Sequence, residues 1–167
     1  LKVSLIGGFM NKAKLFAGMA FASPITVVCF LFYILPCIAF KWYKSLGWME
    51  YAWVFVVNEE KSPKFINNYW KKWAGHAMGN LVVMKKYDPV LNQTTLTHEL
   101  EHCKQCMRLG VFQPILYALF YLAIKFGCKN SDPYYSNAFE IDARRAAGQV
   151  IDVEGFVKKL VKDRDGA

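Results

Sequence analysis

The chain has 167 residues, of which 54% are apolar and 16% aromatic, and its formal net charge is +8. This composition excludes a disordered protein and is more apolar than that of an ordinary soluble domain. The length is enough for one compact domain with an appendage. Because no nucleic-acid-binding signature accompanies the basic residues, we expect no nucleic acid as a partner.

The most apolar segment lies near the N-terminus, where no charged residue occurs between Leu15 and Phe40. This run is longer than the roughly 20 residues needed to cross the hydrocarbon core of a membrane. Pro24 and Pro36 interrupt it, so the path is either a single pass or re-entrant. We predict that residues 1–44 form an N-terminal region with a membrane-anchor helix at about 15–40. A buried core helix and a cleaved signal peptide are the alternatives.

Basic and aromatic residues flank this run, as is typical of membrane interfaces. Lys12 and Lys14 precede it, and Lys41, Trp42 and Lys44 follow it. Further lysines between residues 61 and 86 predict contact with anionic lipid headgroups and a cytoplasmic location for the remaining domain, residues 45–167. The odd count of five cysteines also favours a reducing compartment.

Within this domain, strands are predicted ahead of a helical C-terminal half, which is an α+β pattern. In chain order we expect a strand at 51–57, a helix or irregular segment at 65–79, a strand at 81–84, a helix from Thr94 or Thr95 to Gly110, a buried or interfacial helix within 111–124 that begins near Pro114, a loop at 129–136, a helix at about 138–148 and an amphipathic helix at about 153–162.

The segment His98-Glu99-Leu100-Glu101-His102 lies in the first long helix of that half. At 100° per residue this helix has three faces. One is an apolar stripe (Leu96, Leu100, Cys103 and Met107), one is charged (Thr97, Glu101, Lys104 and Arg108), and the third holds His98, Glu99, His102, Gln105, Cys106 and Leu109. An ordinary surface helix has only two faces, so the third indicates a function.

His98 and His102 are one helical turn apart, at about 5–6 Å between Cβ atoms, and can bind one Zn²⁺ ion. Glu99 can reach a water on that metal without ligating the metal, and can take its proton as general base. This is the H-E-x-x-H pattern of metallohydrolases. The alternative is a charged helix whose histidines pair with neighbouring acids.

Cys106 continues the face of the histidines but lies about 12 Å along the axis from His98, too far for one tetrahedral ion. Cys103 is on the apolar stripe. We therefore expect both cysteines to pack in the core.

A catalytic zinc usually has three protein ligands, so a third donor is expected downstream. Glu140 shares a helix face with Ala143 and Ala147, whose small side chains would allow close approach to another helix. The alternative is that Glu140 caps its own helix, because Asn137 and Glu140 have capping-box spacing. Asp132 and Glu154 are further candidates.

Taken together, the HELEH segment followed by Gln105, and the later segment Phe139-Glu140-Ile141-Asp142-Ala143, resemble the gluzincin zinc peptidases, specifically small bacterial and phage forms. The resemblance covers about residues 74–148. It implies a zincin-like fold with a short sheet and an active-site helix, zinc bound by His98, His102 and Glu140, and Glu99 as base. It also implies that residues 79–83 form an edge strand that pairs with an extended peptide substrate.

One position departs from this pattern. Thermolysin-type enzymes have an Asp four residues after the ligand Glu, where this chain has Arg144. The group that orients a zinc-bound histidine is therefore unassigned, and Asp142 is poorly placed for it on the helical wheel. Tyr134, Tyr135 and His76 are candidates to stabilise the developing oxyanion.

These patterns predict a membrane-associated zinc metallopeptidase that acts on a peptide or protein substrate and contacts membrane lipid. One alternative is a non-catalytic membrane assembly or interaction protein with a structural or vestigial metal site. Another is the metal-assisted hydrolysis of a bond other than a peptide bond.

Overall fold

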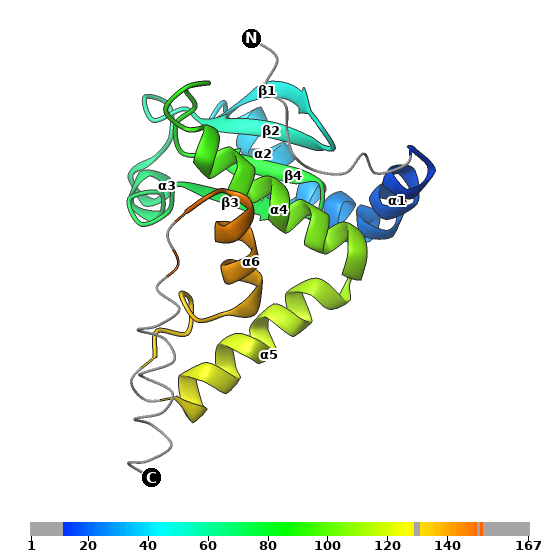
Figure 1. Cartoon of the computed structure of the whole chain (residues 1–167). Helices are drawn as coiled ribbons and strands as arrows, with labels where there is room; N and C mark the ends of the chain where they lie inside the picture. Colours follow the sequence, from blue (N-terminus) through cyan, green and yellow to red (C-terminus); the bar gives the residue numbers. More distant parts are fainter. Residues whose placement is uncertain (1–11, 129–130, 150, 152–167) are drawn as a thin grey trace.

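A four-stranded mixed sheet forms the centre of the computed structural model, which describes residues 12–128, 131–149 and 151 (Figure 1). The strands are β1 (Tyr43–Met49), β2 (Ala52–Val57), β3 (Gly75–Met78) and β4 (Leu81–Met84), in the order β1-β2-β4-β3. β2 pairs parallel with β4, and the other two pairs are antiparallel. The protein is therefore α+β, as predicted.

Helices cover both faces of this sheet. The long N-terminal helical run comprises α1 (Lys12–Cys29), the π-helical turn η1 (Phe30–Ile34) and α2 (Leu35–Ala39). The remaining helices are α3 (Lys64–Tyr69), α4 (Gln93–Leu109), α5 (Phe112–Gly127) and α6 (Ala138–Ala146). One core cluster joins α4 and α1 to one face of the sheet, and a second joins η1, α2 and α3 to the other.

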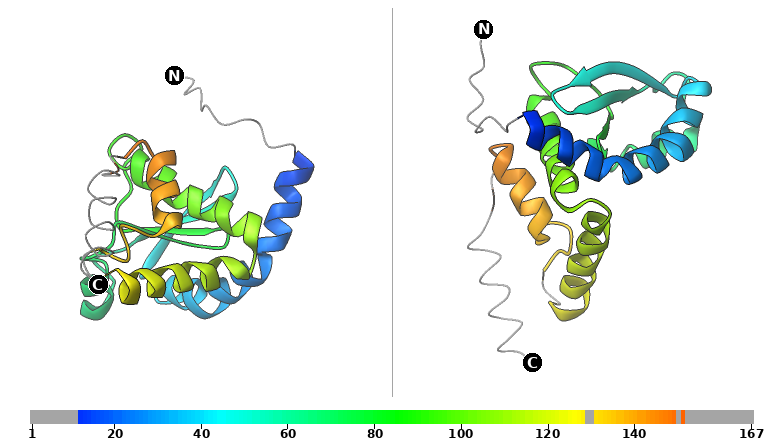
Figure 2. Two further views of the ribbon diagram at one scale, coloured as in Figure 1. Left: turned by 60° about the horizontal axis from the view of Figure 1, so that its bottom comes forward. Right: turned by 90° about the vertical axis from the view of Figure 1, so that its right-hand side faces the viewer.

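The helical run from Lys12 to Ala39 is long and apolar enough to cross a membrane, and it lies against the domain. It continues through Pro24 and Pro36 and curves beneath the sheet (Figure 2). The first strand, β1, begins at Tyr43 and pairs with β2, so the predicted boundary at residues 44 and 45 falls within this strand. β1 was not predicted, because its basic and aromatic residues resemble the flank of a membrane segment.

The predicted position of β4 at the edge of the sheet is wrong. β4 pairs with both β2 and β3, and all four of its residues are buried, so it is a central strand. The edge belongs to β3, which falls in the segment 65–79 that was predicted as helical or irregular. Gly79 makes the β3–β4 turn with a φ of +63°, where a Cβ would clash with Thr26 Oγ1.

α4 and α6 confirm the two helices on which the predicted site depends. α4 begins at Gln93 and is capped by Gly110, and the predicted stripe of Leu96, Leu100, Cys103 and Met107 is buried. α6 is two residues shorter than predicted at its C-terminal end. The predicted helix at 153–162 and the candidate Glu154 lie outside the described residues.

Of the two alternatives predicted for the next helix, a buried or an interfacial one, the buried one is wrong. α5 begins at Phe112 rather than near Pro114, and none of its residues is buried. The chain bends by 112° between α4 and α5, so that α5 stands away from the sheet (Figures 1 and 2). One side of α5 faces a pocket, whereas other residues, including Leu119 and Phe126, are exposed.

Candidate metal centre

α4 places the two histidines side by side. Their Nε2 atoms are 3.2 Å apart, and the two rings meet edge to face. His98 is buried and His102 is half-buried, because this face of α4 lies beneath α6. The one-turn spacing read from the sequence therefore brings two ring nitrogens to one point.

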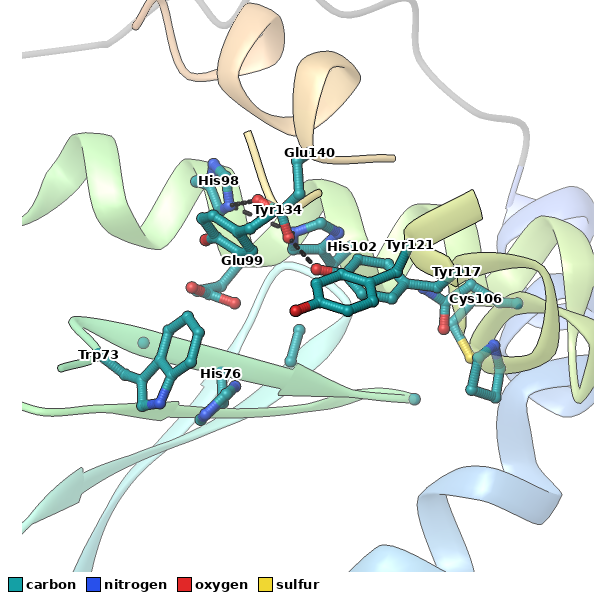
Figure 3. A pocket seen from close by; sticks show the side chains of 15 residues that line it. Trp73, His76, His98, Glu99, His102, Cys106, Tyr117, Tyr121, Tyr134 and Glu140 are labelled. Carbon is teal, nitrogen blue, oxygen red and sulfur yellow. Dashed lines mark hydrogen bonds and ion pairs between the residues drawn. The ribbon is translucent and has the colours of Figure 1, made fainter. Parts of the chain in front are cut away.

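Glu140 reaches the same point from α6 (Figure 3). Its Oε2 lies 3.3 Å from Nε2 of His98, and its Oε1 lies 3.4 Å from Nε2 of His102. Ala143, one turn further along α6, is fully buried, as expected for a close approach of two helices. The structure thus brings the three predicted ligands together.

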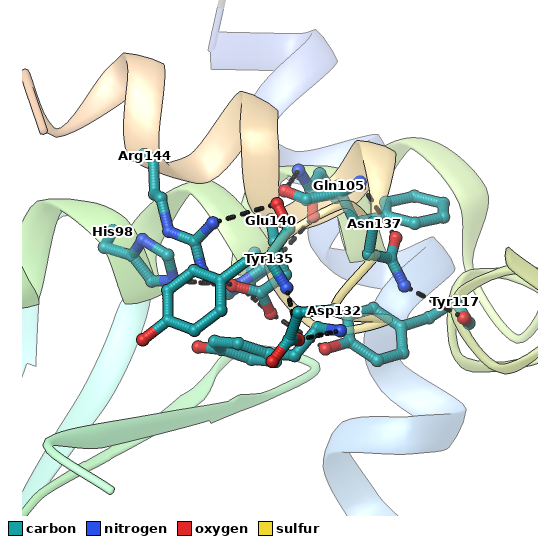
Figure 4. Close-up of polar contacts among 11 residues, drawn as sticks. His98, Gln105, Tyr117, Asp132, Tyr135, Asn137, Glu140 and Arg144 are labelled. Atoms are coloured by element: carbon teal, nitrogen blue, oxygen red, sulfur yellow. Dashed lines mark hydrogen bonds and ion pairs between the residues drawn. The ribbon is translucent and has the colours of Figure 1, made fainter. Parts of the chain in front are cut away.

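The capping alternative for Glu140 is wrong. The side chain of Asn137 caps α6 by accepting a hydrogen bond from the backbone N–H of Phe139 at 3.1 Å, while the Glu140 carboxylate points away toward α4. Asp132 has a different role, since its Oδ1 accepts the backbone N–H groups of Tyr134 and Tyr135 and so shapes the loop before α6 (Figure 4).

The spacing of the three donors fits a small metal ion. Tetrahedral bonds of about 2.0–2.1 Å place neighbouring donors about 3.4 Å apart. The two Nε2 atoms are 3.2 Å apart, and each lies 3.3 or 3.4 Å from a different oxygen of the Glu140 carboxylate. Oε2 of Glu140 is buried, and its polar neighbours are Nε2 of His98 at 3.3 Å and the Arg144 guanidinium at 3.7 Å. His98, His102 and Glu140 could therefore hold a metal ion.

Gln105 is the partner that orients one histidine. Its Oε1 accepts a hydrogen bond from Nδ1 of His102 at 2.8 Å, which leaves the lone pair of Nε2 for a metal. Its amide donates to the carbonyl of Phe139 at 2.9 Å and so ties α4 to α6. Asp142 does not serve this purpose, because it is exposed and pairs with Arg145.

The remaining contacts of Glu140 come from Tyr117 and Arg144. The Tyr117 hydroxyl, on α5, donates to Oε1 at 2.9 Å. Arg144 occupies the position at which the resemblance places an Asp, and its guanidinium lies 3.7 Å from Oε2 and 4.3 Å from the ring of Tyr135 (Figure 4). Sequence reasoning missed Tyr117, because only the bend after α4 turns it toward the site.

The charges at this centre support one another. Burial raises the pKa of Glu140, but hydrogen bonds from His102 and His98 outweigh burial and hold this pKa well below its usual value. Burial lowers the pKa of His102, and the hydrogen bond and negative charge of Glu140 more than compensate, so the pKa is raised. Glu140 therefore remains ionised at neutral pH, as a metal ligand must.

Glu99 lies beside the three donors and points toward β3 (Figure 3). Its carboxylate is buried against Gly75, and burial raises its pKa to about 7 despite the positive charge of the neighbouring histidines. A carboxylate with a pKa near neutral pH can both take up and release a proton there.

A pocket opens over the three donors and Glu99. Its walls are β3, α4, α5 and the loop before α6, with Trp73, Tyr121 and Tyr134 among its lining residues. His76 also lines the pocket, where burial lowers its pKa, and its Nε2 is hydrogen-bonded to the hydroxyl of Tyr69. A site with three protein donors and an open side is typical of catalytic rather than structural zinc.

The structure does not place Tyr135 in this pocket. The side chain of Tyr135 is 63% exposed and stacks on Arg144, whereas the neighbouring Tyr134 lines the pocket. Of the three candidates for stabilising the oxyanion, Tyr134 and His76 line the pocket and Tyr135 does not. Neighbouring residues in a loop face different ways, and periodicity does not determine which of them faces inward.

Cys103 and Cys106 pack in the core, as predicted. Both are buried in the cluster between α4 and the sheet, and burial raises the pKa of each thiol, that of Cys106 to about 11. Thiols of this kind are protonated at neutral pH and are poor metal ligands.

Comparison of the chain with protein families, with curated proteins and with solved structures found no match.

Proposed function

We propose that this protein is a membrane-associated zinc metallopeptidase with a zincin-like fold. The observation that carries the proposal is the convergence of His98, His102 and Glu140, whose ligand atoms lie within 4.8 Å of one another, with the buried Glu99 carboxylate beside them in one open pocket. Zinc is the ion that best matches two imidazoles and one carboxylate at this spacing.

Each residue then has a defined role. His98, His102 and Glu140 hold the ion, and Gln105 and Tyr117 keep His102 and Glu140 in place by the hydrogen bonds described above. When bound, zinc supplies Lewis-acid activation of a water molecule. Glu99 takes up the proton at its carboxylate and delivers it to the leaving amine, a transfer that its pKa of about 7 favours.

The shape of the pocket favours a peptide over other substrates. β3 lies at the edge of the sheet, and Gly75, His76 and Ala77 line the pocket. An extended peptide can pair with such an edge through its main chain, which places a peptide bond near the metal. His76 or Tyr134 would then donate a hydrogen bond to the developing oxyanion.

The apolar N-terminal helix supports membrane association, and the basic residues at both of its ends favour an anionic leaflet such as the cytoplasmic one. Substrates would accordingly be proteins at or near that surface.

Three variants test the function. Glu99→Gln should retain zinc but lose cleavage of a broad fluorogenic peptide library. Glu140→Ala should lose zinc, whereas the matched control Asp142→Ala should keep both zinc and activity, because Asp142 is exposed and pairs with Arg145. Zinc retained in Glu140→Ala but lost in Asp142→Ala would reject the ligand set. A wild-type enzyme that cleaves no peptide would favour the non-catalytic alternative.

A further inference from the structure

The N-terminal helix from Lys12 to Ala39 is apolar on all sides, but its two sides have different surroundings. The inner side includes Ala22, Ile34 and Cys37, which are buried in the two core clusters. The outer side is exposed at helical spacing and includes Phe16, Val28 and Phe32, with exposed fractions of 77%, 55% and 80%. A helix that is apolar all round requires cover on every side, and the domain covers only one.

This helix is attached to the domain along its whole length. Near its start, a Cβ on Gly18 would lie 3.0 Å from Met107 of α4. At its middle, the Thr26 hydroxyl accepts the backbone N–H of Asn80 at 2.9 Å. Near its end, Ile34 and Cys37 pack in the cluster on the opposite face of the sheet. The domain therefore has no free linker that would let the helix stand apart from it.

If this helix crossed the membrane perpendicular to its plane, the attached domain would be drawn into the hydrocarbon core of the bilayer. The midpoint of the helix contacts the β3–β4 turn, which also lines the pocket, so the pocket and the open edge of β3 would lie near mid-bilayer depth. Unpaired sheet edges do not occur in lipid. α4, which contacts α1, would bring its charged side with it, including the exposed Arg108. The attached helix is thus poorly placed to span a membrane.

The chemistry of the outer side indicates lipid as its cover. No charged residue occurs from Leu15 to Phe40, and the Ser23 hydroxyl is already bonded to the carbonyl of Ala20 at 2.6 Å. A protein–protein interface usually carries about one hydrogen bond per 100–200 Å². The outer side of this helix offers few polar groups that could form such bonds. Lysines flank both ends, as anionic headgroups require.

We propose that the Lys12–Ala39 helix is a monotopic anchor, which lies along the membrane surface with its outer side in the acyl region of one leaflet. Both ends then remain on the side of the membrane where the domain is. The partner is an anionic lipid surface, bound by apolar burial along the helix and by the lysines at its ends. This proposal is independent of the peptidase activity.

The topology of the two ends tests this arrangement in the full chain. Lys14→Cys and Lys41→Cys are made separately, with Cys29 and Cys128 replaced by Ser so that the native cysteines left in the described part of the chain are buried. In sealed inside-out membrane vesicles, an impermeant maleimide should label both positions to the same extent, either before detergent or only after it. Labelling of one position before detergent and of the other only afterwards would show a crossing and overturn the proposal.

The outer side is tested by vesicle binding. Phe32→Asp should weaken binding to phosphatidylcholine–phosphatidylserine vesicles by roughly tenfold or more. Val90→Asp is the matched control, because Val90 is 83% exposed in the loop before α4, away from this helix, and binding should not change. Equal binding by Phe32→Asp and wild type would overturn the proposal, as would a dimer in size-exclusion chromatography that Phe32→Asp dissociates.

Discussion

Gly75 controls the position of the proposed catalytic base. A Cβ at this position would lie 2.7 Å from Oε1, 2.8 Å from Cγ and 2.9 Å from Cδ of Glu99. Comfortable contacts between such atoms are about 3.5–4.0 Å, so Gly75→Ala should displace the buried carboxylate by about 1 Å. The backbone of Gly75 does not have a positive φ, so the added methyl group acts through this clash and not through backbone strain.

A misplacement of about 1 Å in a reacting group can lower the rate about 10²-fold. We therefore expect Gly75→Ala to reduce kcat/KM for a cleaved peptide by about 10²-fold while zinc content, measured by metal analysis, stays at one ion per chain. Gly127→Ala is the matched control, because a Cβ at Gly127 meets nothing within 4 Å.

A double-mutant cycle separates this effect from a general loss of structure. If Gly75→Ala acts through Glu99, it should have no further effect on the residual activity of Glu99→Gln. Wild-type activity in Gly75→Ala would refute the reasoning. So would a loss of activity on adding Gly75→Ala to Glu99→Gln that equals the loss it causes in the wild type.

Three more predictions concern the groups around the proposed metal site. Tyr117→Phe removes the hydroxyl that donates to the acidic ligand, so zinc affinity in competition with a chelating dye should fall about tenfold, while Tyr121→Phe, in the same pocket, should bind as wild type. Gln105→Leu removes the acceptor for His102 and should lower zinc affinity roughly 10- to 100-fold; unchanged affinity would exclude an orienting role. In metal-free protein, the pKa of Glu99 rises on folding from 4.5 to about 7, so the folded state favours the protonated acid. The free energy of unfolding of the wild type should accordingly fall by about 3 kcal/mol, relative to that of Glu99→Gln, as the pH rises from 4.5 to about 7. Urea denaturation of both proteins at several pH values measures this difference. A constant difference between the two proteins would contradict the burial of this carboxylate.

The part of the site that could be predicted from the sequence is its local part. His98 and His102 converge because a helix brings residues four apart onto one face. The helix itself, α4, was predictable from its apolar stripe and from the capping residue Gly110. The strand Leu81–Met84 was also recognisable from its apolar run. Its place in the centre of the sheet was not, because pairing on both sides depends on β2 and β3 rather than on β4 itself.

The sequence by itself determined the donor types, the helix that carries two of them and the apolar helix at the N-terminus. Only the tertiary structure decided that Glu140 reaches the histidines instead of capping α6, that Tyr117 rather than Tyr135 touches the site, and that the apolar helix is attached to both faces of the sheet. The physical reason is the distance along the chain between the residues that interact. Helical periodicity acts over one or two turns, whereas these contacts join segments tens of residues apart, and their geometry is set by how α4, α5 and α6 pack and bend.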